Sequence, residues 1–304
     1  MSRELCQVQV LAIVFVSEIC YNERMIIDFH THITPPHIVE NREAYLTRDI
    51  WFEELYGNPK ARLVTADELI AEMDRSGVQK SVTFGFGWRD PGLVRESNDY
   101  VIDAVRRYPD RLIGFGTVNP AYPKDAAREV ERCATNGLRG IGELMPNGQG
   151  FSLDDVHAMG PVVEVATACG MLILTHTSEP VGHRYPGKGT VRPDVVYRFV
   201  ELFPEVVLVC AHWGGGLPFY ELMPEVMRKF RNVYYDTAAS LYLYRDKIFF
   251  LAGILMPTKI LFATDYPLIS QRKMHSRLVL AGLPRGTLSN ILGGNAARLL
   301  GLKG

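Results

Sequence analysis

Short apolar runs alternate with longer amphipathic stretches along the chain from Met25 onward. The runs are rich in β-branched and aromatic residues and are nearly continuous in apolar character, which is typical of strands buried on both faces. We predict eight such strands, at residues 25–29, 79–84, 112–117, 138–143, 171–175, 206–211, 233–236 and 259–263.

The stretches between these runs have the periodicity of helices. Apolar residues recur there at intervals of three and four, which places them on one helical face. Examples are Val94, Val101, Val105 and Tyr108 in one stretch and Val156, Met159, Val163 and Ala166 in another. Thr65 and Asp67 mark a helix start. Helical stretches give way to strands at three glycines, the usual place of a C-terminal cap: Gly77, Gly137 and Gly170.

Strands that alternate with helices form parallel sheets with helices on both faces. Eight of them predict an α/β fold: a (β/α)8 barrel of the TIM type with parallel strands and its site at the C-terminal strand ends. An open, doubly wound sheet is the alternative, but no Gly-x-Gly-x-x-Gly follows the first strand to support it.

Two histidines stand at the end of the first strand. Alternate side chains of an extended chain share a face, so His30 and His32 are expected to point at one spot, with Asp28 deeper on the same face. Two neutral imidazoles that converge are what a borderline metal ion such as zinc requires. A lone His-x-His pair also occurs by chance, so the rest of the chain has to decide.

Other predicted strands also end in residues that bind metals or move protons. These are Glu143, His176, His212 and Asp265. Each alone has a plain structural explanation, such as a core histidine or a carboxylate that caps the next helix. The C-terminal strand ends of a barrel share one mouth, however, so we predict that all four meet the His-x-His pair there.

The remaining histidines are predicted on loops or polar helix faces, exposed to solvent. They are His37, His157, His183 and His275. His183 stays a candidate for the site, because it follows the fifth strand in a loop that contains glycine and proline.

Length and composition narrow the range of partners. A chain of 304 residues suits one large domain. Its formal net charge of -1 and scattered basic residues argue against nucleic acid or a membrane surface as the partner, and favour a small-molecule substrate.

Cys133, Cys169 and Cys210 lie in apolar runs, so we predict core thiols in the reducing cytoplasm. No neighbouring group supports a thiol nucleophile.

Two segments break the alternation. Residues 1–24 hold an apolar run too short to cross a bilayer, and no Ala-x-Ala site supports a signal peptide. We predict that they form a non-native or disordered extension and that 25–304 form a single barrel.

Residues 34–64 carry three prolines and several aromatics directly after the first strand. A loop of this length predicts either an ordered lid or pocket wall, or packing on the outside of the barrel.

The combined motifs resemble a known group. Asp28-x-His30-x-His32, the histidine at 176, the His-x-Gly-Gly form at His212 and Ala-Thr-Asp-Tyr-Pro around Asp265 resemble the amidohydrolase superfamily. They are most similar to its amidohydrolase-2 branch, which includes aminocarboxymuconate-semialdehyde decarboxylase. The ending Gly-Gly-Asn-Ala-Ala-Arg-Leu-Leu at residues 293–300 is also similar to the last helix of that branch, so the resemblance covers about residues 25–302.

The resemblance implies a role for each residue. His30, His32, His176 and Asp265 would be metal ligands, and His212 would activate water or polarise the substrate. Glu143 departs from the decarboxylase pattern and resembles TatD-like hydrolases, in which a glutamate bridges two metals and the residue at the His212 position binds the second. The implied cofactor is one or two divalent ions, zinc first and manganese as the alternative, and the implied assembly is a homodimer.

The ligand set supports two kinds of chemistry. A bound divalent ion lowers the pKa of water from ~15.7 towards 7, and Asp265 can accept the proton. Because of Glu143 we predict a metal-dependent hydrolase of a small ester, lactone or amide. A metal-dependent decarboxylase of a small carboxylated substrate is the alternative, with Arg89, Arg184 and Trp213 as candidates for substrate binding. A barrel without activity is a third interpretation that the full ligand set disfavours.

Overall fold

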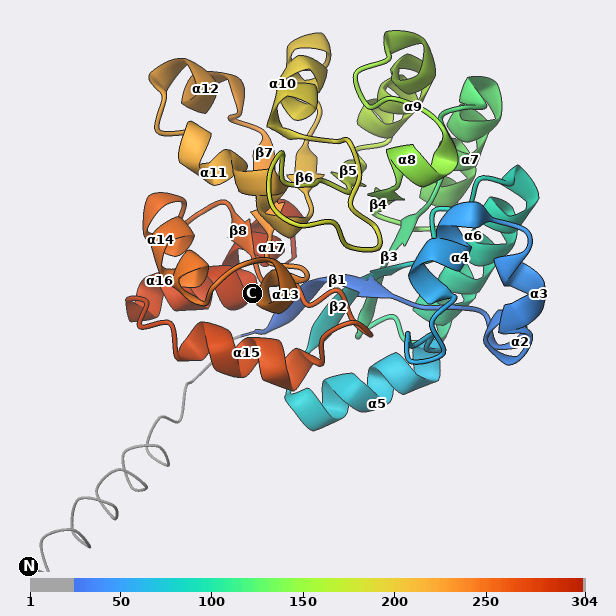
Figure 1. The fold of residues 1–304 in the computed structure, drawn as a ribbon, viewed down its shortest axis with the longest axis horizontal. Coiled ribbons are helices and arrows are strands. Elements are labelled where there is room, and N and C mark those ends of the chain that lie inside the picture. The colour runs from blue at the N-terminus through green and yellow to red at the C-terminus, as the bar shows by residue number, and fades with distance from the viewer. Residues whose placement is uncertain (1–24, 303–304) are drawn as a thin grey trace, which may run out of the picture.

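Eight parallel strands form a ring at the centre of the molecule, with helices packed around it (Figure 1). The computed structural model describes residues 25–302, so the predicted extension at 1–24 lies outside the described residues. The strands are β1 (Ile27–His32), β2 (Lys80–Phe84), β3 (Leu112–Gly116), β4 (Gly140–Leu144), β5 (Leu172–Thr175), β6 (Leu208–Cys210), β7 (Val233–Asp236) and β8 (Ile260–Leu261).

Each strand pairs with the next along the chain, and the last is joined to the first. The backbone N–H of Phe29 donates to the carbonyl of Phe262 at 2.8 Å, and that of Asp265 donates to the carbonyl of His30 at 3.0 Å. The predicted barrel is therefore confirmed and the open sheet is wrong. Strand β1 also runs past its predicted end, because His32 pairs with Phe84 of β2.

Helices cover the outside of the ring and its mouth. Their bounds are α2 (Pro36–Glu40), α3 (Arg42–Leu46), α4 (Ile50–Tyr56), α5 (Ala66–Ser76), α6 (Pro91–Arg107), α7 (Pro123–Thr135), α8 (Pro146–Gln149), α9 (Val156–Ala168), α10 (Pro193–Leu202), α11 (Leu217–Tyr220), α12 (Pro224–Lys229), α13 (Ser240–Leu243), α14 (Lys247–Leu255), α15 (Gln271–Val279), α16 (Arg285–Ser289) and α17 (Asn295–Leu299), with short 3-10 and π turns at η1 (His212–Gly216) and η2 (Asn290–Gly294). The two periodic stretches named above form α6 and α9.

The predicted helix boundaries follow from local chemistry. Thr65 caps α5 and forms a reciprocal capping box with Glu68, which satisfies two otherwise unpaired backbone N–H groups. Gly77 ends the same helix at φ 71°, a left-handed conformation that favours glycine. Gly137 and Gly170 adopt positive φ angles after α7 and α9 in the same way.

Strands β1 and β4 each contain an irregularity in their pairing. The register with the neighbouring strand shifts between Asp28 and Thr31 in β1, and between Ile141 and Leu144 in β4. Irregularities of this β-bulge type change the face to which the following side chains point. They lie next to His30 and Glu143, so they decide which side chains of these two strands enter the barrel mouth.

The segment at 34–64 folds into the helices α2, α3 and α4. Phe52 is fully buried against Phe86 and Trp88, with ring centroids 5.1 and 4.5 Å apart. The other side of α4 faces the mouth, where Leu55 and Tyr56 line a cavity. The segment is therefore an ordered pocket wall, as the first interpretation predicts, and it packs against the loop after β2.

The cysteine prediction is only partly right. Cys133 and Cys210 are buried in the core, but Cys169 is exposed. It follows the last residue of α9 and immediately precedes the left-handed Gly170, where the backbone turns at the surface. Among residues 25–302, no helix is both long and apolar enough to cross a membrane.

The π turn η2 packs closely against the backbone at the start of strand β1. A Cβ built on Gly293 would overlap the carbonyl oxygen of Met25 and lie 2.9 Å from its carbonyl carbon. These are backbone atoms, so the strand itself would have to move. We predict that Gly293→Ala lowers the free energy of unfolding by about 1–3 kcal/mol, the usual cost of overpacking, as measured by urea denaturation.

Gly286→Ala is the matched control. Gly286 lies in α16, and a Cβ there meets nothing within 4 Å. Alanine favours a helix over glycine by roughly 0.5–1 kcal/mol, so this variant should be as stable as the parent or more so. Equal effects of the two substitutions would contradict the packing argument.

Candidate metal-binding active site

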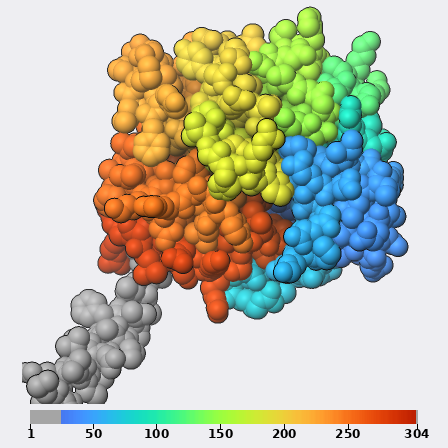
Figure 2. Space-filling model, viewed as in Figure 1, coloured from blue at the N-terminus to red at the C-terminus, as the bar shows by residue number. Residues whose placement is uncertain are grey.

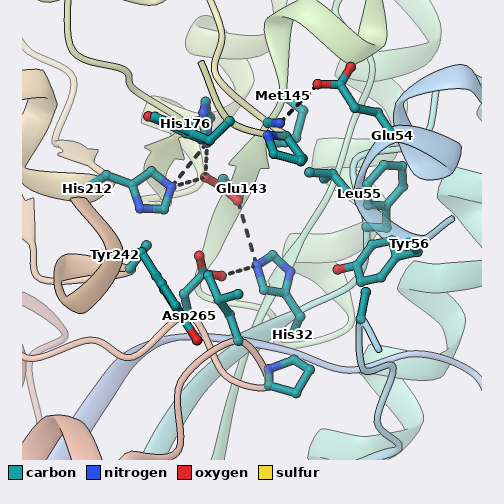
Figure 3. Close-up of a pocket in the computed structure, with 18 of the residues that line it drawn as sticks. His32, Glu54, Leu55, Tyr56, Glu143, Met145, His176, His212, Tyr242 and Asp265 are labelled. Atoms are coloured by element: carbon teal, nitrogen blue, oxygen red, sulfur yellow. Dashed lines mark hydrogen bonds and ion pairs between the residues drawn. The ribbon is translucent and has the colours of Figure 1, made fainter. Parts of the chain in front are cut away.

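Six side chains from five strand ends converge at the mouth of the barrel, and Figure 3 labels all of them except His30. They are His30 and His32 of β1, Glu143 of β4, His176 after β5, His212 after β6 and Asp265 after β8. These are the residues that the sequence singles out as metal ligands and catalytic groups. The structure brings all six together, although they are up to 235 positions apart along the chain, as His30 and Asp265 are.

The first group of donors surrounds His32. Its Nε2 lies 3.2 Å from His30 Nε2, 3.1 Å from Asp265 Oδ1 and 3.7 Å from Glu143 Oε2. His30 Nε2 is 3.5 Å from the same glutamate oxygen. A tetrahedral ion with ligand bonds of about 2.1 Å holds its ligands roughly 3.4 Å apart. The spacing of these donors therefore fits one divalent cation.

The second group lies on the other side of Glu143. Its Oε1 is 3.0 Å from His176 Nδ1 and 3.5 Å from His212 Nε2, and these two nitrogens are 3.2 Å apart. The glutamate therefore turns one oxygen to each group. This is the arrangement of a carboxylate between two sites, and His212 belongs to the second of them by position.

The charges of the cluster depend on one another. Burial lowers the pKa of His30, but the carboxylates of Asp236 and Glu143 outweigh it and raise that pKa well above the ordinary value. Burial favours the neutral form of Glu143, yet His30 and the neighbouring imidazoles hold the pKa of its carboxyl well below the usual range. The carboxyl of Asp265 is subject to the same two opposing effects. Burial raises its pKa, but contact with the histidines lowers it to about 2. The buried carboxylates thus require positive charge, which a divalent cation supplies.

Hydrogen bonds on the far side of three of the imidazole rings, those of His30, His212 and His176, direct their donors into the cluster. Asp236 Oδ2 accepts the Nδ1 proton of His30 at 2.8 Å, so that Nε2 faces the other ligands. His212 Nδ1 lies 3.2 Å from the carbonyl of Ala238. His176 Nε2 lies 3.3 Å from the hydroxyl of Ser178. Such partners fix the tautomer and ring orientation that a metal ligand needs.

Asp236 is the functional residue that sequence analysis missed. Besides His30, its carboxylate accepts the backbone N–H of His212 at 2.9 Å and that of Ala238 at 3.0 Å. It therefore ties three strand ends together: β1, β6 and its own β7. A signal was present, because Asp236 ends the seventh predicted strand as the ligands end theirs.

The backbone near the cluster is strained. Four described residues other than glycine have a positive φ, among them His212 at 54° and Asp265 at 59°. A side chain in this region costs about 1–3 kcal/mol and persists only where the surroundings enforce it. The other two are Trp213 and Ala239, of which Ala239 lines the cavity. The strain is therefore concentrated where the donors must be aimed.

The expected position of Asp28 is wrong. It is fully buried, but its carboxylate accepts hydrogen bonds from Thr264 and from the side chain of Gln271 on α15. The register irregularity in β1 breaks the parity that would have placed it beside His30. Its role is to anchor the backbone before Asp265, and it does not line the cavity.

A cavity of about 550 Å³ leads from the cluster to the surface. Its walls are mainly apolar and aromatic, with Leu55, Tyr56, Phe86, Met145, Tyr242, Leu243 and Leu268, and its basic lining residues include Lys60, Arg62 and His183. Burial, together with the charges of Asp265 and Glu143, raises the pKa of Tyr56, so its hydroxyl stays protonated. The cavity therefore suits a small, partly apolar molecule with an anionic group.

Two segments meet over the mouth. The backbone N–H of Gly187, in the loop between β5 and α10, donates to Glu54 Oε1 of α4 at 3.2 Å. In Figure 2 the yellow atoms of this loop adjoin the blue atoms of the α4 segment. Solvent access to the cluster is therefore shaped by two loops that follow different strands.

The predicted substrate-binding residues lie outside this lining. Arg89 is exposed beside Gly150, and Arg184 is exposed between two lining residues. Trp213 is buried, and its indole N–H donates to Ser240 at 2.7 Å. A direct role of any of the three in substrate binding stays a prediction that their positions do not support.

Three of the other four histidines are exposed as predicted, and the fourth, His275, is not. His37 and His157 are exposed on helices as expected. His183 is exposed and also lines the cavity, so it remains a candidate. His275 is half-buried, with its ring 6.3 Å from that of Phe262, so full exposure was wrong for it.

A (β/α)8 barrel with clustered histidines and carboxylates at its C-terminal mouth defines the class of metal-dependent barrel enzymes. Comparison with known families gives the particular group: the family model described as amidohydrolase matches residues 27–302. The chain belongs to the amidohydrolase family.

The individual proteins that the chain resembles share less than a quarter of its residues. The chain is 24% identical to 2-amino-3-carboxymuconate-6-semialdehyde decarboxylase of Dictyostelium discoideum, over 91% of each protein. The structure of 5-carboxyvanillate decarboxylase from Sphingomonas paucimobilis matches with a TM-score of 0.75 and 23% identity, over 92% of this chain and 99% of that one. The 5-carboxyvanillate decarboxylase of Novosphingobium aromaticivorans, in complex with manganese and 4-hydroxy-3-methoxy-5-nitrobenzoic acid, matches with a TM-score of 0.73 and 19% identity, over 91% and 96%.

The contacts of Asp236 generate a prediction. Asp236→Asn keeps the shape of the side chain but loses the charge that holds the Nδ1 proton of His30. Changes of this kind cost about 10–100-fold in metal affinity. We expect that loss for zinc or manganese, measured by competition with a chromogenic chelator. Asp246→Asn, at an exposed ion pair with Arg277, is the control and should bind as the parent does. Unchanged affinity in Asp236→Asn would refute the orienting role.

Proposed function

We propose that the protein is a metal-dependent decarboxylase of a small carboxylated substrate. One observation carries the proposal: similarity to decarboxylases extends over nine-tenths of both chains, while the full donor cluster is present at the mouth. Sequence analysis favoured a hydrolase because of Glu143. The comparisons support its alternative, the decarboxylase, better than that first choice.

The donor set fits a divalent cation. His30, His32, Asp265 and Glu143 would hold one ion, and Glu143, His176 and His212 have the spacing to hold a second. Histidine nitrogen with carboxylate oxygen suits zinc or manganese. When bound, the cation polarises a substrate oxygen and stabilises the negative charge that develops there.

Loss of carbon dioxide breaks a carbon–carbon bond and leaves its electron pair on the substrate carbon, which must then receive a proton. His212 is the donor we propose. Burial lowers its pKa, but Glu143 raises it to about 9. Its Nε2 turns to the cluster and its Nδ1 to the carbonyl of Ala238. Asp265, at the same mouth, is the other group that can move a proton.

The walls of the cavity favour the same reaction. Leu55, Phe86 and Met145 line it with apolar surface close to the cluster. A carboxylate placed there exchanges its hydration for fixed protein groups, whereas carbon dioxide is neutral and needs no such hydration. The hydroxyl of Tyr56 and the cations of Lys60 and Arg62 are available to orient polar substituents.

Hydrolysis of a small ester, lactone or amide is the second candidate. Glu143 supports it, because the carboxylate turns one oxygen to each donor group, as a bridge between two ions would. In that case His212 would be a ligand and could not supply the proton. The number of bound ions therefore separates the two functions.

The test of function measures products and metal together. The purified protein, loaded with manganese or zinc, is incubated with 5-carboxyvanillate and 2-amino-3-carboxymuconate-6-semialdehyde, and with a panel of esters and lactones. We expect release of carbon dioxide from a carboxylated substrate and one tightly bound ion per chain by mass spectrometry. Ester or lactone cleavage with two ions and no carbon dioxide would establish the hydrolase instead.

The double variant His30→Ala and His32→Ala is the companion to this test. It removes two donors from the first group. We expect loss of metal and of turnover while far-ultraviolet circular dichroism shows a folded barrel. Metal retained at parental affinity by the folded variant would place the ion elsewhere.

Arg62 generates a further prediction. It lines the cavity and its guanidinium lies 5.7 Å from the ring of Tyr266, so it is held near the mouth. A charge-assisted bond to a carboxylate is worth about 1.5–3 kcal/mol, which corresponds to roughly 10–150-fold in binding. We expect Arg62→Met to raise KM of the carboxylated substrate by that factor, with a smaller effect on kcat.

Arg184→Met is the comparison for Arg62. Arg184 is exposed and does not line the cavity, so its KM should match that of the parent. The reverse outcome, with Arg184 critical and Arg62 neutral, would restore the prediction made from the sequence.

A further inference from the structure

His176 has a hydrogen-bond partner that connects it to the loop over the mouth. Its Nδ1 faces Glu143 in the cluster (Figure 3), and its Nε2 lies 3.3 Å from the hydroxyl of Ser178. Ser178 is fully buried, and its Oγ also accepts the backbone N–H of Gly189 at 2.9 Å. The loop between β5 and α10 therefore closes onto this histidine at a single hydroxyl group.

Further polar contacts lead from Ser178 to a carboxylate. Tyr185, whose ring lines the cavity, donates its hydroxyl proton to Glu179 Oε2 at 2.8 Å. Burial and this bond to Glu179 raise the pKa of Tyr185, whereas a hydrogen bond from Ser178 lowers it. Burial and the charge of Glu179 also raise the pKa of Tyr244, directly after α13, so the carboxylate lies near a second hydroxyl. His176, Ser178, Tyr185 and Glu179 thus form one series of hydrogen bonds, which we call the Glu179 chain.

The carboxylate gives the Glu179 chain a direction. An ionised carboxylate accepts but cannot donate, so Tyr185 donates to Glu179 and its oxygen is left to accept from Ser178. A hydroxyl has one hydrogen and two acceptor sites. With the hydrogen of Ser178 on Tyr185, the serine oxygen accepts the N–H of Gly189 and the Nε2 proton of the histidine. His176 then keeps a lone pair on Nδ1, the nitrogen that faces the cluster.

This lone pair is needed in both uses of the cluster. His176 requires it to bind a divalent cation, because a protonated ring nitrogen cannot be a ligand. Where His212 is the proton donor, its Nε2 lies 3.2 Å from Nδ1 of His176, which can accept that proton in a hydrogen bond. If the Ser178 hydrogen turned to the ring instead, the histidine proton would lie on Nδ1 and neither contact could form.

Ser178 is held too firmly to offer the ring a different geometry. Its backbone N–H donates to the carbonyl of Val191 at 2.9 Å, and a Cβ built on Gly215 would overlap its carbonyl oxygen. What can vary is the direction of its hydroxyl hydrogen. We propose that Tyr185 is a positioning residue: through Ser178 it holds His176 in the tautomer with a proton on Nε2 and a lone pair turned to the cluster. The proposal rests on the proposed function only in that a divalent ion occupies the cluster, and not on the reaction that follows.

The first test observes the tautomer directly. Protein with ¹⁵N in its histidine rings is loaded with zinc, and the ring nitrogens are recorded by NMR; the signals of His176 are those lost in His176→Gln. We expect a proton on Nε2 and none on Nδ1 in the parent. Tyr185→Phe removes the acceptor for the Ser178 hydroxyl, so both nitrogen resonances of His176 should shift towards the other tautomer. The resonances of His30, whose Nδ1 proton Asp236 accepts, should stay unchanged.

Zinc affinity, measured by competition with a chromogenic chelator, is the second readout. Tyr185→Phe should weaken binding about 10-fold, the lower end of the range for partners of a metal ligand. Ser178→Ala should weaken it at least as much, and adding Tyr185→Phe to Ser178→Ala should cost nothing more, because the chain is already broken. Tyr242→Phe is the matched control: it removes an exposed hydroxyl from the same cavity wall and should bind zinc as the parent does.

Three results would bear on the proposal in different ways. Unchanged nitrogen resonances of His176 in Tyr185→Phe would overturn it, and so would losses of zinc affinity that add up in the double variant. A parent that binds no zinc would overturn it together with the proposed function. A parent that shows the expected tautomer and its loss in Tyr185→Phe, but releases no carbon dioxide, would reject the decarboxylase and support the positioning role.

Discussion

The site depends on mutual compensation of charge around one buried carboxylate. Glu143 is almost inaccessible to water, yet burial does not keep it neutral, because imidazoles face both of its oxygens. A lone buried charge would cost several kcal/mol. The imidazoles of His30, His212 and His176 are in turn held in place by Asp236, a carbonyl group and a hydroxyl group behind them. Ligands, carboxylates and orienting groups therefore form one unit, and a divalent cation completes its charge balance.

This unit requires the barrel. Its members come from the ends of β1, β4, β5, β6, β7 and β8, and only a closed parallel ring brings those ends to one mouth. The sequence predicts this much for a simple physical reason. Doubly buried strands are continuously apolar, so a polar residue at their ends stands out, as His176 and His212 do. Parallel pairing then places those ends on the same side.

The parts that the sequence does not predict depend on single-residue geometry or on distant contacts. The parity of β1 fails at Asp28, because a register irregularity lets His30 face the mouth while Asp28 turns to α15. Asp236 ends a strand as the ligands do, but its importance lies in partners on β1 and β6 that no local pattern reveals. The lining residues Lys60 and Arg62 follow three short helices whose direction depends on packing of Phe52 against Trp88. Arg89 and Arg184 are nearer to strands and still miss the cavity.

The difference between decarboxylation and hydrolysis is decided by parts of the site other than the shared donors. Both reactions use a divalent cation with a nearby acid–base group, and Asp265 and His212 can serve either. What differs is the use of His212, which would be a proton donor beside one ion and a ligand beside two. The loops contribute the second difference. Apolar walls from α4 and from the segments after β2 and β4 favour a substrate that leaves as neutral carbon dioxide, whereas hydrolysis needs a path for water to the reacting carbon. Function in this barrel therefore follows from how the loops after β1 and β5 control water at a cluster that the strand ends have already assembled.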